Sequence, residues 1–122
     1  MTRVIFDSSF LMAIGETPTT WFEDTVDRIG KFQPVLLECV WGELHELASG
    51  KGRKSRTARV ALELSKRFDR LACGGARVDD EIISAALAEG AIVATTDTDL
   101  ARAARAAHLS VISLRKGRVE LR

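Results

Sequence analysis

The 122 residues of the chain are enough for one domain with an ordinary core, and at 46% hydrophobic and 29% charged they are too apolar for disorder and too evenly charged for a histone-like or acidic-tail protein. The composition indicates a globular domain and excludes fibres, linkers and coiled coils. The formal net charge is only +1, so the overall charge does not predict a nucleic-acid partner. Its distribution is uneven, however, because residues 1–50 carry a net −5 and residues 51–122 a net +6.

The first half of the chain predicts alternating strands and helices. Short β-branched or aliphatic runs indicate strands, and apolar side chains at helical spacing indicate helices. In chain order we expect a strand at 4–6, a helix opening at Ser8, a helix over 21–32, a strand at 35–37 and a helix over 39–47.

The second half predicts the same alternation after a polar, glycine-interrupted break at 50–56. In chain order we expect a helix over 60–71, a strand at 76–78, a helix from 82 that Gly90 ends, a strand at 91–95, a helix over 100–107 and a strand at 110–114. The residues 115–121 form either an antiparallel edge strand or a tail.

This alternation favours an α/β domain with a central, mainly parallel five-stranded sheet and helices on both faces. Neither a linker nor an internal repeat divides residues 1–122, so a single domain is expected. Cys39 and Cys73 fit no zinc spacing, and we expect them to be reduced thiols rather than a disulfide. No apolar run reaches the roughly 18 residues of a membrane-spanning helix, and Asp7 interrupts the N-terminal run, so a cytoplasmic protein is expected.

Acidic residues follow several predicted strands. In open parallel sheets, ligands bind beyond the carboxyl ends of the strands, where side chains from separate segments meet. The acidic residues expected at this edge are Asp7, Glu43, Asp79, Asp80, Asp97 and Asp99.

Each aspartate has an alternative interpretation as a helix N-cap, and Glu43, which is not at a cap position, has one as a solvated side chain. Together, however, carboxylates at one edge repel one another and raise their pKa values unless a cation neutralises them. Carboxylate oxygens favour Mg²⁺ or Mn²⁺, and two such ions about 4 Å apart suit phosphodiester hydrolysis. His45 and His108 lie in no nucleophile motif, and Gly50-Lys51-Gly52 is not a P-loop.

Basic residues are concentrated beside the segments that carry these acids. They form either a solvated loop and helix surface or a rim that binds RNA phosphates. The candidate RNA-binding residues are Lys51, Arg53, Lys54, Arg56, Arg102 and Arg105, with Arg115, Lys116 and Arg118 as further members of the rim.

Four short motifs carry a resemblance that spans nearly the whole chain. They are Val4-Ile5-Phe6-Asp7-Ser8-Ser9, Glu43-Leu44, Asp79-x-x-Ile82-x-x-x-Ala86 and Val93-Ala94-Thr95-Thr96-Asp97-Thr98-Asp99-Leu100. In this order and spacing the sequence resembles PIN-domain nucleases of the compact prokaryotic type, similar to ribosomal-RNA-processing and toxin PIN domains. One departure is Glu38-Cys39, where a proline often begins the second helix.

The resemblance implies a three-layer α/β/α fold and an endoribonuclease that uses Mg²⁺ or Mn²⁺ to hydrolyse RNA, leaving a 5′-phosphate and a 3′-hydroxyl. By position, Asp7 would be the central metal ligand, Glu43 and Asp79 would complete the ligand set, and Asp97 would hold a second ion or its water. Asp99 would be a further ligand, and Asp80 a reserve acid. The hydroxyl groups of Ser9 and Thr95 would support the cluster through hydrogen bonds.

Other functions remain open at this stage. A phosphatase of haloacid-dehalogenase type needs a second aspartate where Ser9 stands, and a toprim-like site on Asp97 and Asp99 needs an upstream strand that ends in glutamate. A non-catalytic module that binds RNA or protein is the main alternative. The expected partners are RNA, an antitoxin or ribosome-assembly protein, and a second copy of the chain that packs on the helix of residues 21–32, with no membrane.

Overall fold

The computed structural model describes residues 1–17 and 19–122. The strands are β1 (Thr2–Phe6), β2 (Phe32–Leu37), β3 (Asp69–Leu71), β4 (Ile92–Ala94), β5 (Val111–Arg115) and β6 (Arg118–Leu121). The helices are α1 (Ser8–Glu16), α2 (Trp21–Ile29), α3 (Glu38–Ala48), α4 (Arg53–Ser65), α5 (Val78–Glu89) and α6 (Thr98–Ala106).

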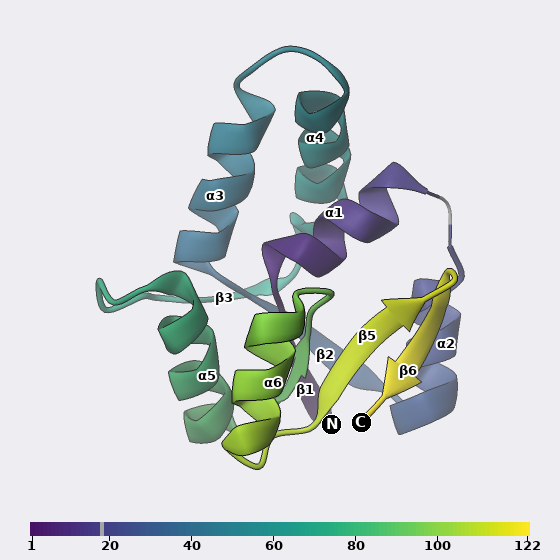
Figure 1. Ribbon diagram of the computed structural model, residues 1–122, viewed down its shortest axis with the longest axis vertical. Coiled ribbons are helices and arrows are strands. Elements are labelled where there is room, and N and C mark those ends of the chain that lie inside the picture. Colours follow the sequence, from purple (N-terminus) through teal and green to yellow (C-terminus); the bar gives the residue numbers. More distant parts are fainter. Residues whose placement is uncertain (18) are drawn as a thin grey trace.

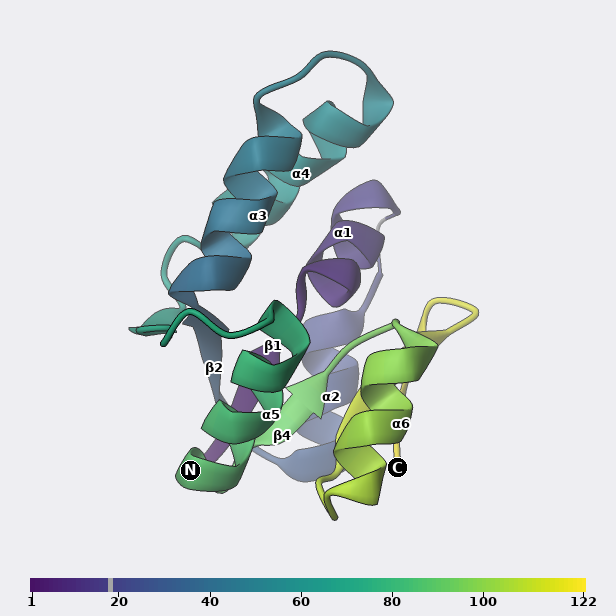
Figure 2. The ribbon, with the colours of Figure 1, turned by 60° about the vertical axis from the view of Figure 1, so that its left-hand side comes forward.

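The strands form one sheet in the order β3-β2-β1-β4-β5-β6. The first five are parallel, and β6 pairs antiparallel with β5. Helices α5 and α6 cover one face, and α1 and α2 lie on the other (Figures 1 and 2). The predicted α/β class with a mainly parallel sheet is therefore confirmed. The predicted number of five strands is wrong, because the C-terminal segment adds β6 as an edge strand.

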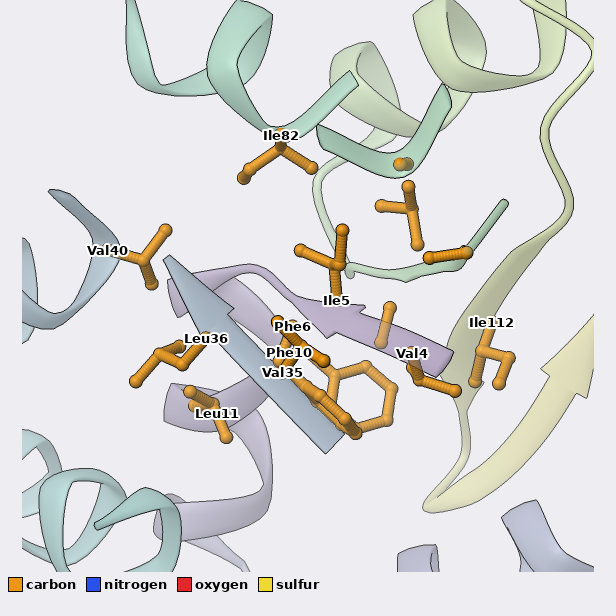
Figure 3. Packing of buried hydrophobic residues seen from close by; sticks show 14 of the residues in the cluster. Val4, Ile5, Phe6, Phe10, Leu11, Val35, Leu36, Val40, Ile82 and Ile112 are labelled. Atoms are coloured by element: carbon orange, nitrogen blue, oxygen red, sulfur yellow. The ribbon is translucent and has the colours of Figure 1, made fainter. Parts of the chain in front are cut away.

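The core lies around β1, the strand that pairs with both β2 and β4. Val4, Ile5 and Phe6 are at most 1% exposed, as expected for a strand that is covered on both faces. Figure 3 shows Ile82 of α5 on one side of β1 and β2, and Leu11 of α1 on the other. This packing fixes the carboxyl end of β1, where Asp7 follows.

The structure corrects the prediction for residues 50–78. The basic residues after Gly52 begin helix α4 and do not form a loop. The prediction failed because a solvated helical turn has the same polar composition as a loop. Strand β3 is Asp69–Leu71, within the range predicted as a helix, and it pairs with Val35–Leu37 of β2. The predicted strand at 76–78 is wrong, because Val78 already begins α5.

The structure also shortens the helix predicted over 21–32. Helix α2 ends at Ile29, where Gly30 adopts a φ of 78° that favours glycine, and Phe32 begins β2. Pro34 pairs with Val4 within β2. The pairing of β2 with β3 starts only at Val35, so Pro34 lies where β2 has no β3 partner.

Cys39 and Cys73 form a disulfide with a Cα–Cα distance of 6.1 Å, so the prediction of reduced thiols is wrong. The register of the sheet explains the pairing. Leu37 of β2 lies opposite Leu71 of β3, and each cysteine follows two residues later. The position of β3, which the sequence pattern did not indicate, therefore brings the two cysteines together. Within the described residues, no helix is long and apolar enough to cross a membrane.

An ion pair fixes β6 to α2. Asp24 accepts hydrogen bonds from Arg118 Nε (2.8 Å) and Nη2 (3.1 Å) and, at 3.4 Å, from the backbone N–H of Val119. The hydrogen bonds from Arg118 are the main cause that lowers the pKa of Asp24. Arg118 therefore has a carboxylate partner, although its side chain remains 71% exposed.

Candidate functional site

Asp7 lies at the point where β1 ends and α1 begins, and the residue is only 5% exposed. It occupies the N-cap position of α1, but its side chain makes no capping hydrogen bond. Instead, Oδ2 accepts hydrogen bonds from Ser9 Oγ (2.6 Å) and Thr95 Oγ1 (2.9 Å). The capping interpretation therefore fails for Asp7, whose carboxylate is oriented by two hydroxyl groups.

The two hydroxyl groups connect Asp7 to the loop after β4. Ser9 Oγ accepts a hydrogen bond from the backbone N–H of Thr96, and Thr95 Oγ1 accepts one from the N–H of Asp97, both at 3.0 Å. Each hydroxyl has a single proton and directs it to Asp7. The supporting role predicted for Ser9 and Thr95 thus has a geometric basis: they hold Asp7 in register with the segment of Asp97.

Glu43 and Asp79 belong to the same electrostatic group. Burial, followed by the charge of Asp7, raises the pKa of both carboxyl groups. A hydrogen bond from the Ser8 side chain opposes the rise at Glu43, and the charge of Arg77 opposes it at Asp79. Separate helices, α3 and α5, thus bring these two acids to the side of Asp7.

Asp97 is both a helix cap and a member of this group. Its Oδ1 accepts hydrogen bonds from the N–H groups of Asp99 (2.8 Å) and Leu100 (3.3 Å), which are unpaired donors at the start of α6. Its negative charge also raises the pKa of Asp79. No described residue donates a hydrogen bond to Oδ2, so this oxygen can bind a ligand while Oδ1 caps the helix.

The other two candidate acids lie at the margin. The side chain of Asp99 is 87% exposed and 3.7 Å from Arg102. Asp80 is exposed, and its charge raises the pKa of Asp79 only as a minor cause. We define Asp7, Glu43, Asp79 and Asp97 as the acidic cluster.

The acidic cluster has the chemistry of a divalent-cation site in an open arrangement. Carboxylate oxygens are the ligands that Mg²⁺ and Mn²⁺ prefer, and a cation would offset the repulsion that raises the pKa values of Glu43 and Asp79. In the described part of the chain, no three His, Cys, Asp or Glu side chains are already arranged to hold a metal ion. A cavity of about 300 Å³, lined by Ser8, Glu43, Glu46 and Leu47, lies beside Glu43.

The predicted basic residues form two exposed groups. One lies at the tip of the α3–α4 hairpin, which projects from the sheet (Figures 1 and 2). It consists of Lys51, Arg53, Lys54 and Arg56, and Arg53 is 3.3 Å from Glu16. The other group, Arg102 and Arg105, lies on α6 close to Asp97. The structure thus places cations on both sides of the acidic cluster but does not gather them into one patch.

Sequence reasoning missed Ser8 and Arg77, which modulate the acidic cluster. Ser8 follows Asp7 directly, and Arg77 directly precedes α5, so the proximity of each residue to a candidate acid could be read from the sequence. Their roles depend on side-chain direction, which neither spacing nor composition reveals.

Comparison with known proteins identifies the family. The family described as PIN like domain matches residues 4–117. Because the match spans nearly the whole chain, the protein belongs to the PIN-like domain family, and the family predicted from the four motifs is confirmed. No curated protein matches the sequence.

Solved structures agree with this assignment. The PIN domain endonuclease Utp24 superposes with a TM-score of 0.78 at 27% identity, over 98% of this chain and 90% of that one. A domain of a functionally unknown protein from Methanocaldococcus jannaschii has a TM-score of 0.66 at 15% identity, over 100% and 97%. PAE2754 from Pyrobaculum aerophilum has a TM-score of 0.55 at 17% identity, over 83% and 78%. The last two matches show the fold alone.

Proposed function

We propose that this protein is a metal-dependent endoribonuclease that hydrolyses RNA phosphodiester bonds at the acidic cluster. The observation that carries the proposal is the buried Asp7 carboxylate, which Ser9 and Thr95 orient while acids from three other segments surround it. The similarity to the endonuclease Utp24 supports the same conclusion. The acids support binding of a cation, and the basic residues on either side of them favour a polyanionic substrate.

The four acids have different tasks in this proposal. Asp7 is the fixed ligand, because its burial and two hydroxyl donors leave it little freedom. Glu43 of α3 and Asp79 of α5 would complete the ligand set of a bound ion. Asp97 offers Oδ2 while Oδ1 keeps the start of α6 in place. A bound Mg²⁺ or Mn²⁺ supplies an activated water and stabilises charge on the scissile phosphate.

Substitution of Asp7 by asparagine tests the chemistry. An asparagine oxygen can still accept the bonds from Ser9 and Thr95, so the fold should remain, but the central negative charge is lost. We expect RNA cleavage in Mn²⁺ to fall about a thousandfold, which corresponds to several kcal/mol of lost transition-state stabilisation. The matched control is Asp99→Asn, which removes a charge from an exposed side chain and should retain nearly full activity. Wild-type cleavage rates in pure, folded Asp7→Asn protein contradict the proposal.

Thermal unfolding tests cation binding independently of cleavage. By linkage, Mn²⁺ that binds the folded state raises Tm with its concentration. We expect this rise for the wild type and for Asp99→Asn, and a much smaller one for Asp79→Asn. The open arrangement of the acids makes a non-catalytic PIN-like module for RNA or protein the competing function. The absence of both the Tm rise and RNA cleavage would support that module.

The cellular role that we propose is cleavage of RNA in the cytoplasm, either in RNA processing or as a toxin. Induced expression separates these roles. A toxin arrests growth when the wild type is induced and not when Asp7→Asn is induced, whereas a processing enzyme leaves growth unchanged.

Phe22, which is 48% exposed on α2, marks a surface for an antitoxin, a ribosome-assembly protein or a second copy of the chain. Sedimentation of wild-type and Phe22→Ser protein tests the dimer.

A further inference from the structure

A groove of about 220 Å³ lies next to the acidic cluster, between the loop that carries Asp97 and the β5–β6 hairpin. It lies beside β4, β5 and β6, whereas Glu43 follows β2 on the other half of the sheet. The cavity is smaller than the roughly 300 Å³ at which pockets begin to enclose a drug-sized ligand. Its size suits one unit of a chain that continues beyond it.

The antiparallel register gives the hairpin wall of the groove its polar character. Ser113 of β5 lies opposite Glu120 of β6, so their side chains project from the same face. Side chains two residues further along each strand share that face, which adds Arg115 and Arg122. Two backbone hydrogen bonds between Arg122 and Val111, of 2.7 and 2.8 Å, hold Arg122 beside β5. All four of these polar side chains line the groove.

Three arginines from separate segments give the groove free positive charge. Arg105 comes from α6, Arg115 from the end of β5 and Arg122 from the residue after β6. Within the described residues, none of the three has a carboxylate within 4.0 Å. By contrast, Arg102 and Arg118 have the acidic partners Asp99 and Asp24. The groove arginines are therefore available to bind an anion.

Glu120 restricts the kind of anion. A purely phosphate ligand gains nothing from a carboxylate in the groove and is repelled by it. A ribonucleotide, however, offers its hydroxyl and base N–H groups as donors to Glu120 in addition to phosphate oxygens for the arginines. The combination of three cations with Ser113 and Glu120 fits a nucleotide better than a plain polyanion.

We propose that this groove binds a nucleotide of the RNA strand next to the scissile phosphate, with the phosphate on Arg105, Arg115 and Arg122 and the sugar or base on Ser113 and Glu120. The proposal rests on the function proposed above. It assigns the RNA a direction: the strand leaves the acidic cluster over α6 and the β5–β6 hairpin, and not over the tip of the α3–α4 hairpin (Figure 1).

Binding of a fluorescein-labelled, single-stranded 12-nucleotide RNA, measured by anisotropy in EDTA, tests the groove without cleavage. We expect the Arg105→Gln/Arg115→Gln variant to bind about tenfold more weakly, as the loss of charge-assisted hydrogen bonds requires. The slope of log Kd against log salt should fall by about 1.4, because each phosphate contact to a single strand contributes about 0.7. Both arginines are exposed, so the variant should fold, which its Tm will verify.

The matched control is Lys31→Gln/Arg67→Gln, which removes the same charge from two exposed residues that lie outside the groove and outside both basic groups. We expect its affinity to stay within about twofold of the wild type. Equal losses in the two variants, or no loss in the groove variant, overturn the proposal. Inorganic polyphosphate should displace the RNA only at a concentration more than tenfold above that of unlabelled RNA, and equal potency overturns the assignment to a nucleotide.

The outcome is separable from that of the proposed function. If the wild type does not cleave RNA, and the groove variant loses RNA affinity while the control variant does not, the nuclease proposal fails and the proposal of a nucleotide-binding groove stands. If the wild type cleaves, Asp7→Asn does not, and the groove variant binds normally, the nuclease stands and the groove fails. If both stand, the groove variant should have a higher KM with little change in kcat, as expected for a residue that binds substrate and transition state equally.

Discussion

Replacement of Thr95 by valine tests the hydrogen-bond network under Asp7. Thr95 is fully buried, and its hydroxyl both donates to Asp7 Oδ2 and accepts from the N–H of Asp97. Valine fills the same space, so the change removes the hydroxyl without opening a cavity. One N–H then lacks its partner, and the Asp7 carboxylate loses one of its two donors.

The structure gives the size of the effect. An unsatisfied buried donor costs about 1–3 kcal/mol, and a hydrogen bond to a charged group contributes about 1.5–3 kcal/mol. Asp97 itself is exposed, so part of the first cost is relieved by water, and we expect a loss of about 3 kcal/mol in the free energy of unfolding. For a chain of 122 residues this lowers Tm by about 12 °C.

Thr25→Val is the matched control, because Thr25 is also buried, at 1% exposure. Its hydroxyl donates to the carbonyl of Trp21 four residues earlier, which the helical N–H also binds, so the loss should be below about 1 kcal/mol. Thr95→Ser, which keeps the hydroxyl and loses a methyl group, should be more stable than Thr95→Val. Urea unfolding of the three variants in metal-free buffer measures these differences. The stabilising role of the hydrogen bonds around Thr95 is refuted if Thr95→Val and Thr25→Val are equally stable. It is also refuted if Thr95→Ser is less stable than Thr95→Val.

Two further predictions concern the acids and the disulfide. Burial and then the charge of Asp7 raise the pKa of Glu43 above its ordinary value of 4.5. Between that value and the raised pKa, the folded wild type binds more protons than the unfolded chain, so its free energy of unfolding falls as the pH rises. Urea unfolding in EDTA should therefore show Glu43→Gln to be more stable than the wild type at pH 7 and no more stable at pH 4. A stability difference that does not change with pH contradicts a raised pKa at Glu43. Reduction of Cys39–Cys73, which closes a loop of 34 residues, should cost up to about 4 kcal/mol and lower Tm by about 15 °C, with no effect of reductant on Cys39→Ala/Cys73→Ala protein.

The centre of the fold could be predicted from the sequence because its signals are local. Residues 4–6 and 91–94 are continuous apolar runs, each followed by a polar residue, and a strand buried on both faces requires that pattern. The position of Asp7 beside Thr95 follows, since β1 and β4 are parallel neighbours. Gly90 likewise ends α5 in the left-handed conformation, as predicted.

The features that the sequence did not reveal depend on tertiary contacts. Strand β3 has only three residues, with Asp69 and Arg70 among them, and it exists because it pairs with β2. The disulfide was missed because it depends on this strand. The basic residues after Gly52 form the first turn of a helix, which composition cannot distinguish from a loop. The groove arginines come from three segments that only the β5–β6 register and α6 bring together.

The dual role of Asp97 affects how sequence variation at the cluster should be interpreted. A related chain that has lost all catalytic function still needs an oxygen acceptor at this position to cap α6, so selection for folding alone can keep an aspartate here as readily as an asparagine or a serine. Glu43 and Asp79 make no capping contact, and their mutual repulsion with Asp7 destabilises the fold when no cation is bound. Without selection for activity these two acids should be lost first. Their retention in relatives is therefore the informative sign of a working nuclease, whereas an aspartate at position 97 alone is not.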